Sequence, residues 1–197
     1  MMIDQEYLNN YFGTTWRNTC LPIESFEHSG LSLANKVSER DHVLDVGCGL
    51  NPFKGLIKNL IGIDPAFEEA DYKLTLEDFV SSTNKKFDVI FCLGSINFGT
   101  REDIERQIEL LSFLLTDHGK IYWRCNPGLH DHKNEEWFKE KYSPIYLTNF
   151  YQQKFANSAT LISSFDSNFD YKLFKKLLYA KDSIILYAIK ELCAIWL

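Results

Sequence analysis

Two carboxylates and two glycines in the first third of the chain have the types and spacing of a ligand-binding site. Gly47 and Gly49 directly follow the apolar run 43–46. Glycine permits positive φ angles and lets the backbone come close to a bound molecule. Asp45 lies within this run, and Asp64 ends a second apolar run. A carboxylate at the end of a strand can accept hydrogen bonds from two neighbouring hydroxyls, such as those of a ribose, so the pattern indicates a nucleotide-binding α/β fold.

The elements that must hold these residues in place are predicted to be parallel strands. The stretch 87–94 is nearly all apolar, as is typical of a parallel strand covered on both faces. Strand-like and helix-like stretches alternate, which predicts an α/β fold with a Rossmann-like, doubly wound, mostly parallel sheet. Strands are predicted at residues 42–47, 60–64, 71–75, 87–94, 120–125, 160–166 and 183–189. The last two lack a long crossover helix in the usual place, so we expect an antiparallel strand at the C-terminal edge.

Helices are predicted from apolar spacing and capping residues. Thr100 and Asp103 form a capping-box pattern before an apolar stripe, and Gly119 is expected to end that helix. Residues 12–18 are expected to form a loop, and 126–144 a long polar flap. Further helices are predicted over residues 3–12, 32–40 and 149–157.

Composition limits the class of protein. The 197 residues are 45% hydrophobic and 15% aromatic, which suits a folded domain with a substantial core. We expect a single domain over 1–197, with 1–40 as an N-terminal helical cover and 41–197 as the ligand-binding core. The net charge of −6 is unfavourable for non-specific binding to nucleic acid or to a membrane surface.

The cysteines and the N-terminus indicate a cytoplasmic protein. The five cysteines are scattered and show no C-x-x-C spacing, which argues against a disulfide framework or a metal site and favours a reducing compartment. No apolar run approaches the roughly 20 residues of a membrane helix. The N-terminus lacks a basic region followed by an apolar one, so no secretory signal is expected. The sequence does not predict the oligomeric state.

Four short motifs follow one another at plausible spacing. They are Asp45-x-Gly47-x-Gly49, Ile63-Asp64-Pro65, the stretch 87–94, and His118-Gly119-Lys120-Ile121. In this order the chain resembles the class I S-adenosylmethionine-dependent methyltransferases, roughly over residues 40–190. The resemblance implies S-adenosylmethionine as the cofactor and methyl transfer as the activity.

The resemblance also implies roles for individual residues. The backbone around Gly47 and Gly49 would approach the methionine and ribose parts of the cofactor, and Asp45 would hold its ammonium group. Asp64 would bind the ribose, the residues from Thr75 would contact the adenine, and those from Leu93 would lie under the methyl group. The implied cofactor-binding residues are Asp45, Gly47, Cys48, Gly49, Asn51, Asp64, Pro65, Thr75, Leu76, Leu93, Gly94 and Ser95.

Three positions depart from the family pattern. Asn51 stands where a third small residue is usual, and Pro52 follows it, which still allows a helix to begin there. Asp64 follows Asp45 by only 19 positions, so that helix is expected to be shorter by about one turn. Thr75 stands where many members carry an acidic residue. The rival interpretation, an NAD-dependent dehydrogenase, needs a third glycine where this chain has Pro52.

The acceptor of the methyl group is less well indicated than the cofactor. The chain after residue 94 has no Asn/Asp-Pro-Pro-aromatic motif and no Pro-Cys nucleophile, so a small-molecule acceptor is expected and nucleic acid is not. His130 and His132, in the flap, are candidate general bases. Arg17 is a candidate partner of the cofactor carboxylate. The alternative from another class is a methyltransferase-like binding module without turnover.

Overall fold

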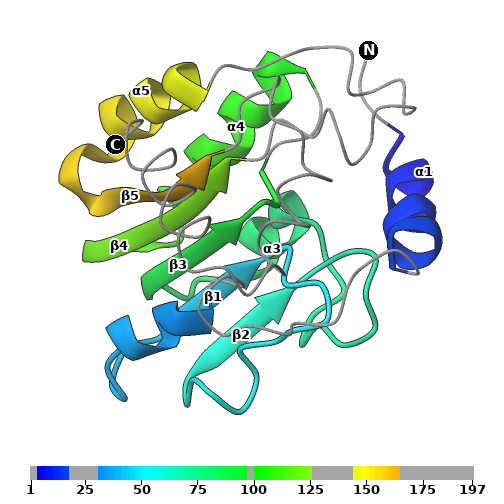
Figure 1. The fold of residues 1–197 in the computed structure, drawn as a ribbon, viewed down its shortest axis with the longest axis horizontal. Helices are drawn as coiled ribbons and strands as arrows, with labels where there is room; N and C mark the ends of the chain where they lie inside the picture. The colour runs from blue at the N-terminus through cyan, green and yellow to red at the C-terminus, as the bar shows by residue number, and fades with distance from the viewer. Residues whose placement is uncertain (1–3, 18–30, 97–99, 126–143, 165–197) are drawn as a thin grey trace, which may run out of the picture.

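The described residues form a five-stranded parallel sheet with the strand order β2-β1-β3-β4-β5. The computed structural model describes residues 4–17, 31–96, 100–125 and 144–164. All four strand pairings are parallel, and Figure 1 shows the arrowheads pointing the same way. The strands are β1 Val43–Val46, β2 Leu60–Ile63, β3 Phe87–Leu93, β4 Leu115–Cys125 and β5 Ala159–Ser164. The predicted mostly parallel α/β fold is confirmed, while the predicted antiparallel strand at 183–189 lies outside the described residues.

Three α-helices cover one face of the sheet. They are α3 Leu76–Ser82, α4 Arg101–Leu111 and α5 Pro144–Phe155. The stripe of Ile104, Ile108 and Leu111 on α4 is fully buried against the sheet residues Leu44 and Ile90. This apolar cluster holds the central strands β1 and β3 in a solvent-excluded layer.

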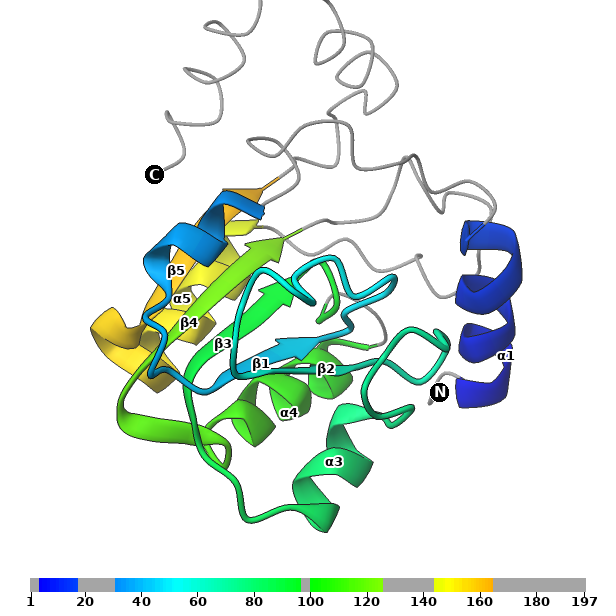
Figure 2. The ribbon, with the colours of Figure 1, turned by 90° about the horizontal axis from the view of Figure 1, so that it is seen from below.

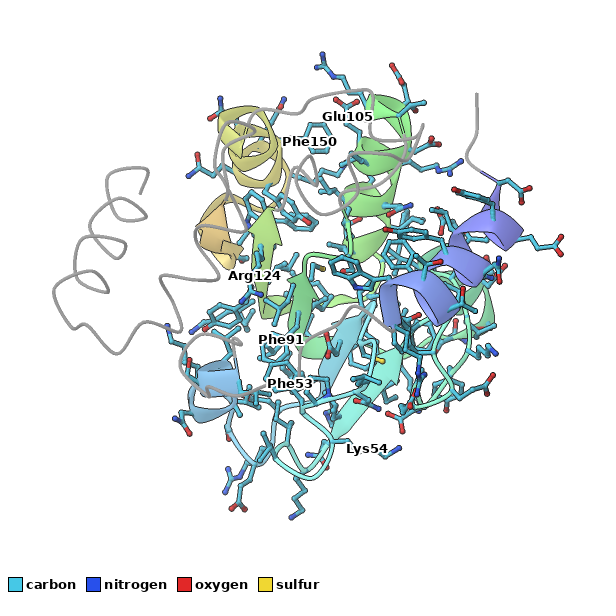
Figure 3. All side chains as sticks on the ribbon, turned by 45° about the vertical axis from the view of Figure 1, so that its right-hand side comes forward. Phe53, Lys54, Phe91, Glu105, Arg124 and Phe150 are labelled. Carbon is cyan, nitrogen blue, oxygen red and sulfur yellow. The ribbon has the colours of Figure 1, made fainter. Side chains whose placement is uncertain are left out.

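The opposite face is covered by shorter elements. The 3₁₀-helix η2, Leu31–Lys36, packs there with the turns of residues 50–59. Phe53 from these turns meets Phe91 of β3 with ring centroids 4.8 Å apart, and Figure 3 shows the two rings together. The helix predicted over 32–40 is therefore a short 3₁₀-helix.

The helix expected directly after the glycines is absent. Residues 50–59 form consecutive turns, closed by hydrogen bonds such as Lys54 N to Asn51 O at 3.0 Å. Asn51 has φ +53° and Gly55 φ +86°, and neither value is compatible with a right-handed helix. The prediction of a helix beginning at Pro52 is wrong because these two residues turn the chain out of the helical region.

The N-terminus forms a longer helical segment than predicted. The helix α1, Gln5–Asn10, is capped by Asp4, and it continues into the π-helix η1, Tyr11–Trp16. Figure 2 places α1 beyond the arrowhead of β1, at the carboxyl edge of the sheet. The prediction of a loop over 12–18 is wrong for residues 12–17, because their backbone continues the helical hydrogen bonding. Residue 18 lies outside the described residues.

Several element boundaries also differ from the predictions. The Thr100–Asp103 capping box is present. However, α4 ends at Leu111, and Gly119 lies inside β4, where an added Cβ would come 2.6 Å from Leu115 Cδ1. Gly119 therefore allows close packing within the strand and does not end a helix. The strand predicted at 71–75 is reduced to one parallel bridge between Ile63 and Tyr72.

Candidate functional site

The predicted site lies at the carboxyl ends of β1, β2 and β3. These ends share one edge because the strands are parallel. The neighbours of β1 are β2 on one side and β3 on the other, so the direction of winding reverses between β1 and β3. Open α/β sheets bind ligands outside the strand ends at such a reversal. The structure brings the glycine loop, which we define as residues 47–51, together with Asp64 and Ser95 at this position.

The backbone of the glycine loop is fastened to the end of β2. The amides of Gly47 and Cys48 donate hydrogen bonds to the Ile63 carbonyl at 2.8 and 3.1 Å. Gly47 has φ +67° and Gly49 φ +55°, values that glycine adopts without strain. The loop is thus held in one conformation by β2, without a following helix.

The two glycines of the loop have different surroundings. A Cβ added to Gly47 would lie 2.3 Å from Ser95 Cβ, whereas a Cβ added to Gly49 would meet no atom within 4 Å. Gly47 is therefore required for contact with the segment that follows β3. Gly49 faces open space, so a ligand can approach the backbone there. The Ser95 hydroxyl is buried, and no described residue forms a hydrogen bond with it.

Asp64 connects the end of β2 to the glycine loop. It is 8% exposed, and it accepts hydrogen bonds from Gly49 N at 3.0 Å and from Ala66 N at 2.8 Å, one on each oxygen. A carboxylate has about four lone-pair sites, so Asp64 can accept further bonds besides those from the backbone. Burial raises the pKa of Asp64, and the backbone hydrogen bonds oppose this effect. The arrangement suits the acceptance of two hydroxyl hydrogen bonds.

Asp45 is the most deeply buried carboxylate at the site among the described residues. It is 3% exposed, and no described residue hydrogen-bonds to its side chain. Its neighbours in the sheet are Gly62 on β2 and Phe91 on β3. Burial, reinforced by the charge of Asp64, raises the pKa of Asp45 to about 7. An acceptor in this position favours a ligand that brings a donor or a positive charge.

Asn51 is directed into the protein. Its side chain is 4% exposed, and Nδ2 donates to the Glu69 carbonyl at 3.0 Å and to Asp71 Oδ2 at 3.4 Å. Oδ1 is buried without a hydrogen bond to any described residue. The family resemblance assigned Asn51 to the cofactor. In the structure its side-chain amide is hydrogen-bonded to the turn after β2.

The other predicted cofactor residues lie around this edge in several environments. Thr75 caps α3: its hydroxyl accepts from Asp78 N at 3.1 Å and donates to Asp78 Oδ2 at 2.8 Å. Leu76 is buried in the core beneath α3. Leu93 and Gly94 end β3 and are partly exposed, as is Pro65 after β2. Cys48 is a buried thiol whose pKa is raised by burial and by neighbouring carboxylates.

The N-terminal helical segment docks beside the site. Arg17 forms a two-pronged ion pair with Glu69, with one of the two contacts at 3.0 Å. Its guanidinium also lies 5.4 Å from the centre of the Phe67 ring. A Cβ added to Gly13 would come 3.0 Å from the Ala66 carbonyl oxygen. The predicted N-terminal cover therefore contacts the loop that follows Asp64, and Arg17 pairs with a protein carboxylate there.

Sequence analysis missed the residues that brace the site from behind. Asp71 accepts hydrogen bonds from Gly62 N at 2.9 Å and from Lys54 Nζ at 2.6 Å. Glu69 had no predicted role, and Asp71 was placed at the start of a predicted strand. The signal available in the sequence was a glycine inside β2 followed by a dense group of carboxylates. His130 and His132 lie outside the described residues.

The electrostatics of the site favour a cationic ligand. Four carboxylates, of residues 45, 64, 69 and 71, surround the glycine loop. Of the nearby cations, Arg17 is paired with Glu69 and Lys54 with Asp71. Within the described ranges no group of His, Cys, Asp and Glu side chains is arranged to hold a metal ion. S-adenosylmethionine carries an ammonium and a sulfonium, so the unpaired carboxylate of Asp45 and the open space at Gly49 fit this cofactor.

The fold is similar to those of solved methyltransferase structures. A SAM-dependent methyltransferase from Archaeoglobus fulgidus is 18% identical, with a TM-score of 0.51, and the match covers 77% of this chain and 74% of that one. An O-methyltransferase family protein from Burkholderia thailandensis is 11% identical, with a TM-score of 0.51, and the match covers 76% of this chain and 55% of that one. This chain has the Rossmann-like α/β fold of those proteins. Such low identities establish the fold alone, because one fold hosts many functions.

Comparison of sequences gives less information about this chain than comparison of structures. No curated protein is similar enough to count as a relative. Residues 128–189 match the SERRATE/Ars2 N-terminal domain family, which is less than a third of the 197 residues. The described part of this segment contains α5 and β5, and β5 pairs with β4 inside the parallel sheet. None of the helices in the described part of the chain combines the length and apolar character needed to span a bilayer.

Proposed function

We propose that this protein binds S-adenosylmethionine at the glycine loop and transfers its methyl group to a small-molecule acceptor. One observation carries the proposal: an unpaired buried carboxylate, Asp45, lies beneath a glycine loop whose Gly49 is open to a ligand. A cation with hydroxyl groups satisfies both Asp45 and the spare acceptor sites of Asp64. The similarity of the fold to methyltransferase structures supports the same choice.

The absence of a helix after the glycine loop argues against an NAD-dependent dehydrogenase. Dinucleotide sites place the pyrophosphate at the N-terminus of a helix that begins in the glycine loop. Here residues 50–59 form turns, so no helix dipole points at the loop. The carboxylates of Asp45 and Asp64 would also repel two phosphate charges. Both effects disfavour a pyrophosphate and are compatible with a cation.

Each residue of the site has a defined task in this proposal. S-adenosylmethionine supplies an activated methyl group on a positively charged sulfur. Asp64 accepts hydrogen bonds from the ribose hydroxyls, Gly49 lets the ligand approach the backbone, and Asp45 balances the positive charge of the amino acid part. Ser95, whose buried hydroxyl has no described partner, lies against Gly47 and positions the glycine loop beside the end of β3. Most of the rate enhancement then comes from positioning.

Titration calorimetry of the wild type and Asp64→Ala tests this proposal. We expect the wild type to bind S-adenosylmethionine and to show no binding of NAD. Asp64→Ala should lose at least tenfold in affinity, because it removes charge-assisted hydrogen bonds worth about 1.5–3 kcal/mol each. Asp88→Ala is a matched control: Asp88 accepts from His42 N at 2.9 Å at the opposite edge of the sheet. The proposal fails if the wild type does not bind S-adenosylmethionine, or if Asp64→Ala binds it equally well.

A binding module without turnover remains the second candidate. The observation that favours it is that the described residues at the site include no histidine, the usual general base. A methyl-transfer assay over a broad panel of small-molecule acceptors separates the two candidates. Transfer to any acceptor, lost in Asp64→Ala, establishes the enzyme. Tight cofactor binding with no transfer to the whole panel favours the module.

A further inference from the structure

We propose that Asn51 is a positioning residue that holds the glycine loop in its binding shape, replacing the helix that usually follows such a loop. This inference rests on the proposed function, since the loop is taken to bind the cofactor. Asn51 closes the loop at φ +53° and is 4% exposed. Its side-chain amide donates a hydrogen bond to the Glu69 carbonyl, in the turn after β2.

The partners of Asn51 are fixed from several sides. Asp71 Oδ2 accepts hydrogen bonds from both Asn51 Nδ2 and Gly62 N, at 3.4 and 2.9 Å. Asp71 Oδ1 accepts from Lys54 Nζ at 2.6 Å, and the Asp71 amide donates to the Gly62 carbonyl at 2.9 Å. Asp71, one of the two acceptors of the Asn51 amide, is therefore anchored to β2. Asn51, Asp71 and the Glu69 carbonyl together form an arrangement that we define as the clamp.

The strand β2 is shaped to admit this clamp. A Cβ added to Gly62 would lie 2.9 Å from Asn51 Oδ1 and 2.9 Å from Cys48 Sγ. Gly62 does not have a positive φ, so the backbone does not require glycine there. Space for the Asn51 side chain does require it. A glycine within a strand lowers stability because it loses more conformational entropy on folding. Here this cost is offset because the missing side chain leaves room for Asn51 and lets the loop close.

The clamp explains how the loop keeps its shape without a helix. In a loop followed by a helix, the helical hydrogen bonds fix the backbone after the glycines. Here the turns of 50–59 contain a second positive φ at Gly55, and they provide no such continuous ladder. The amide of Asn51 supplies the missing restraint directly at the end of the loop. Gly49 N then stays in place to donate to Asp64, which in turn orients the carboxylate proposed to bind the ribose.

Two substitutions at Asn51 distinguish the effect of its side-chain hydrogen bonds from the effect of its backbone conformation. Asn51→Gly keeps the positive φ without strain and removes the amide. Asn51→Asp keeps the size but presents a carboxylate to two acceptors. We expect both to weaken S-adenosylmethionine binding by about tenfold or more, measured by calorimetry. Asp88→Ala, at the far edge of the sheet, should lower the melting temperature to a similar extent and leave the dissociation constant unchanged.

Gly62→Ala tests the clamp without changing any residue proposed to touch the cofactor. The added methyl should displace Asn51 and weaken binding, and it should cost less in the Cys48→Ala, Asn51→Gly background, where both neighbours are smaller. Such non-additivity is the signature of one shared contact. Equal affinities for the wild type, Asn51→Gly and Gly62→Ala would overturn the proposal while leaving the cofactor assignment intact.

Hydrogen exchange does not require the cofactor, so it tests the clamp separately from the proposed function. If the wild type fails to bind S-adenosylmethionine, the proposed function is wrong, and hydrogen exchange of the Gly49 amide decides the clamp. Faster exchange at Gly49 in Asn51→Gly than in Asp88→Ala supports the clamp. Equal exchange at Gly49 in both variants overturns it.

Discussion

At the scale of single residues, the buried carboxylate of Asp45 lowers the stability of the unliganded fold and favours the binding of a cation. The folded protein buries its carboxylate without a described hydrogen-bond partner, and the pKa rises to about 7 as a result. A group in this state makes the unliganded fold less stable once it ionises. A cationic ligand reverses that penalty, because it pairs with the ionised form. Such strain is commonly retained where function requires it.

The pH dependence of stability tests this effect of Asp45. Between pH 4 and about 7 the folded protein keeps a proton on Asp45 that the unfolded chain releases, so stability falls as the pH rises through this window. Asp45→Asn stays neutral throughout. Relative to this variant, the unliganded wild type should lose as much as about 4 kcal/mol between pH 4 and pH 8. Urea unfolding across this range measures the difference, and a constant difference would show that Asp45 ionises freely in the folded state.

The Asp45→Asn variant is also expected to change the stability of the fold and the affinity for the cofactor in opposite directions. At pH 8 the variant should melt at a higher temperature than the wild type without ligand, yet bind S-adenosylmethionine more weakly. Thermal unfolding with and without the cofactor measures both effects. A variant that is both less stable and fully able to bind would contradict the role given to this carboxylate.

At the scale of elements, the N-terminal segment α1–η1 is attached to the site by side chains and not by a sheet contact. The Arg17–Glu69 pair lowers the pKa of Glu69 and fixes the end of the π-helix against the loop after β2. The same residue, Glu69, offers its carbonyl to Asn51. Docking of the N-terminal segment and the shape of the glycine loop therefore depend on one turn. π-helical turns are rare and often occur near functional sites.

Loss of this ion pair should release the segment without unfolding the sheet. In Arg17→Gln the amides of residues 5–17 are expected to exchange hydrogen faster, and those of β1 and β3 to keep their protection. The pair is partly exposed to solvent, which screens its charges, so the effect on global stability should be small. Lys154→Gln, which breaks the partly exposed Lys154–Glu109 pair, is the control and should leave residues 5–17 unchanged. Unchanged exchange in Arg17→Gln would show that other contacts hold the segment.

At the scale of the whole molecule, the central strands β1 and β3 unite both apolar layers. On β3, Ile90 is fully buried on the helix-covered face, and Phe91 is fully buried on the face covered by Phe53. Both faces are dry because parallel sheets are covered on both sides. The site at the carboxyl edge is therefore carried on a rigid scaffold, which limits the reorganisation needed when a ligand binds.

Truncation in this scaffold should cost far more than truncation on the turns that cover it. Ile90→Ala is expected to lower the free energy of unfolding by about 2–5 kcal/mol, because it leaves a cavity between β3 and the helices that cover this face. Leu56→Ala, at a side chain 53% exposed, should change it by less than about 0.5 kcal/mol. Urea denaturation followed by circular dichroism compares the two variants. Similar losses in both would contradict a core centred on β3.

Local sequence patterns were sufficient for most of the described strands and for the residues at their ends, although the strand predicted at 71–75 is only one bridge. The apolar runs ending at Val46, Ile63 and Leu93 specify buried parallel strands, since few other structures bury such runs. Parallel pairing then places their carboxyl ends on one edge, which is why Gly47, Asp64 and Ser95 could be assigned to one site. Thr100 and Asp103 likewise specify a helix start through purely local hydrogen bonds.

Only the tertiary structure decided how the glycine loop is held and which residues brace it. The turns after Pro52 replace a helix because Asn51 and Gly55 adopt positive φ. The Asn51 side chain also contacts Glu69 and Asp71, which lie far along the chain. A hydrogen bond between residues some 20 positions apart leaves no periodic trace in the sequence. The raised pKa of Asp45 also requires burial, which arises only when the sheet and its covering layer assemble. The sequence thus determined most of the strands and the edge at which the candidate site residues gather, and packing determined the electrostatics and the rigidity of that site.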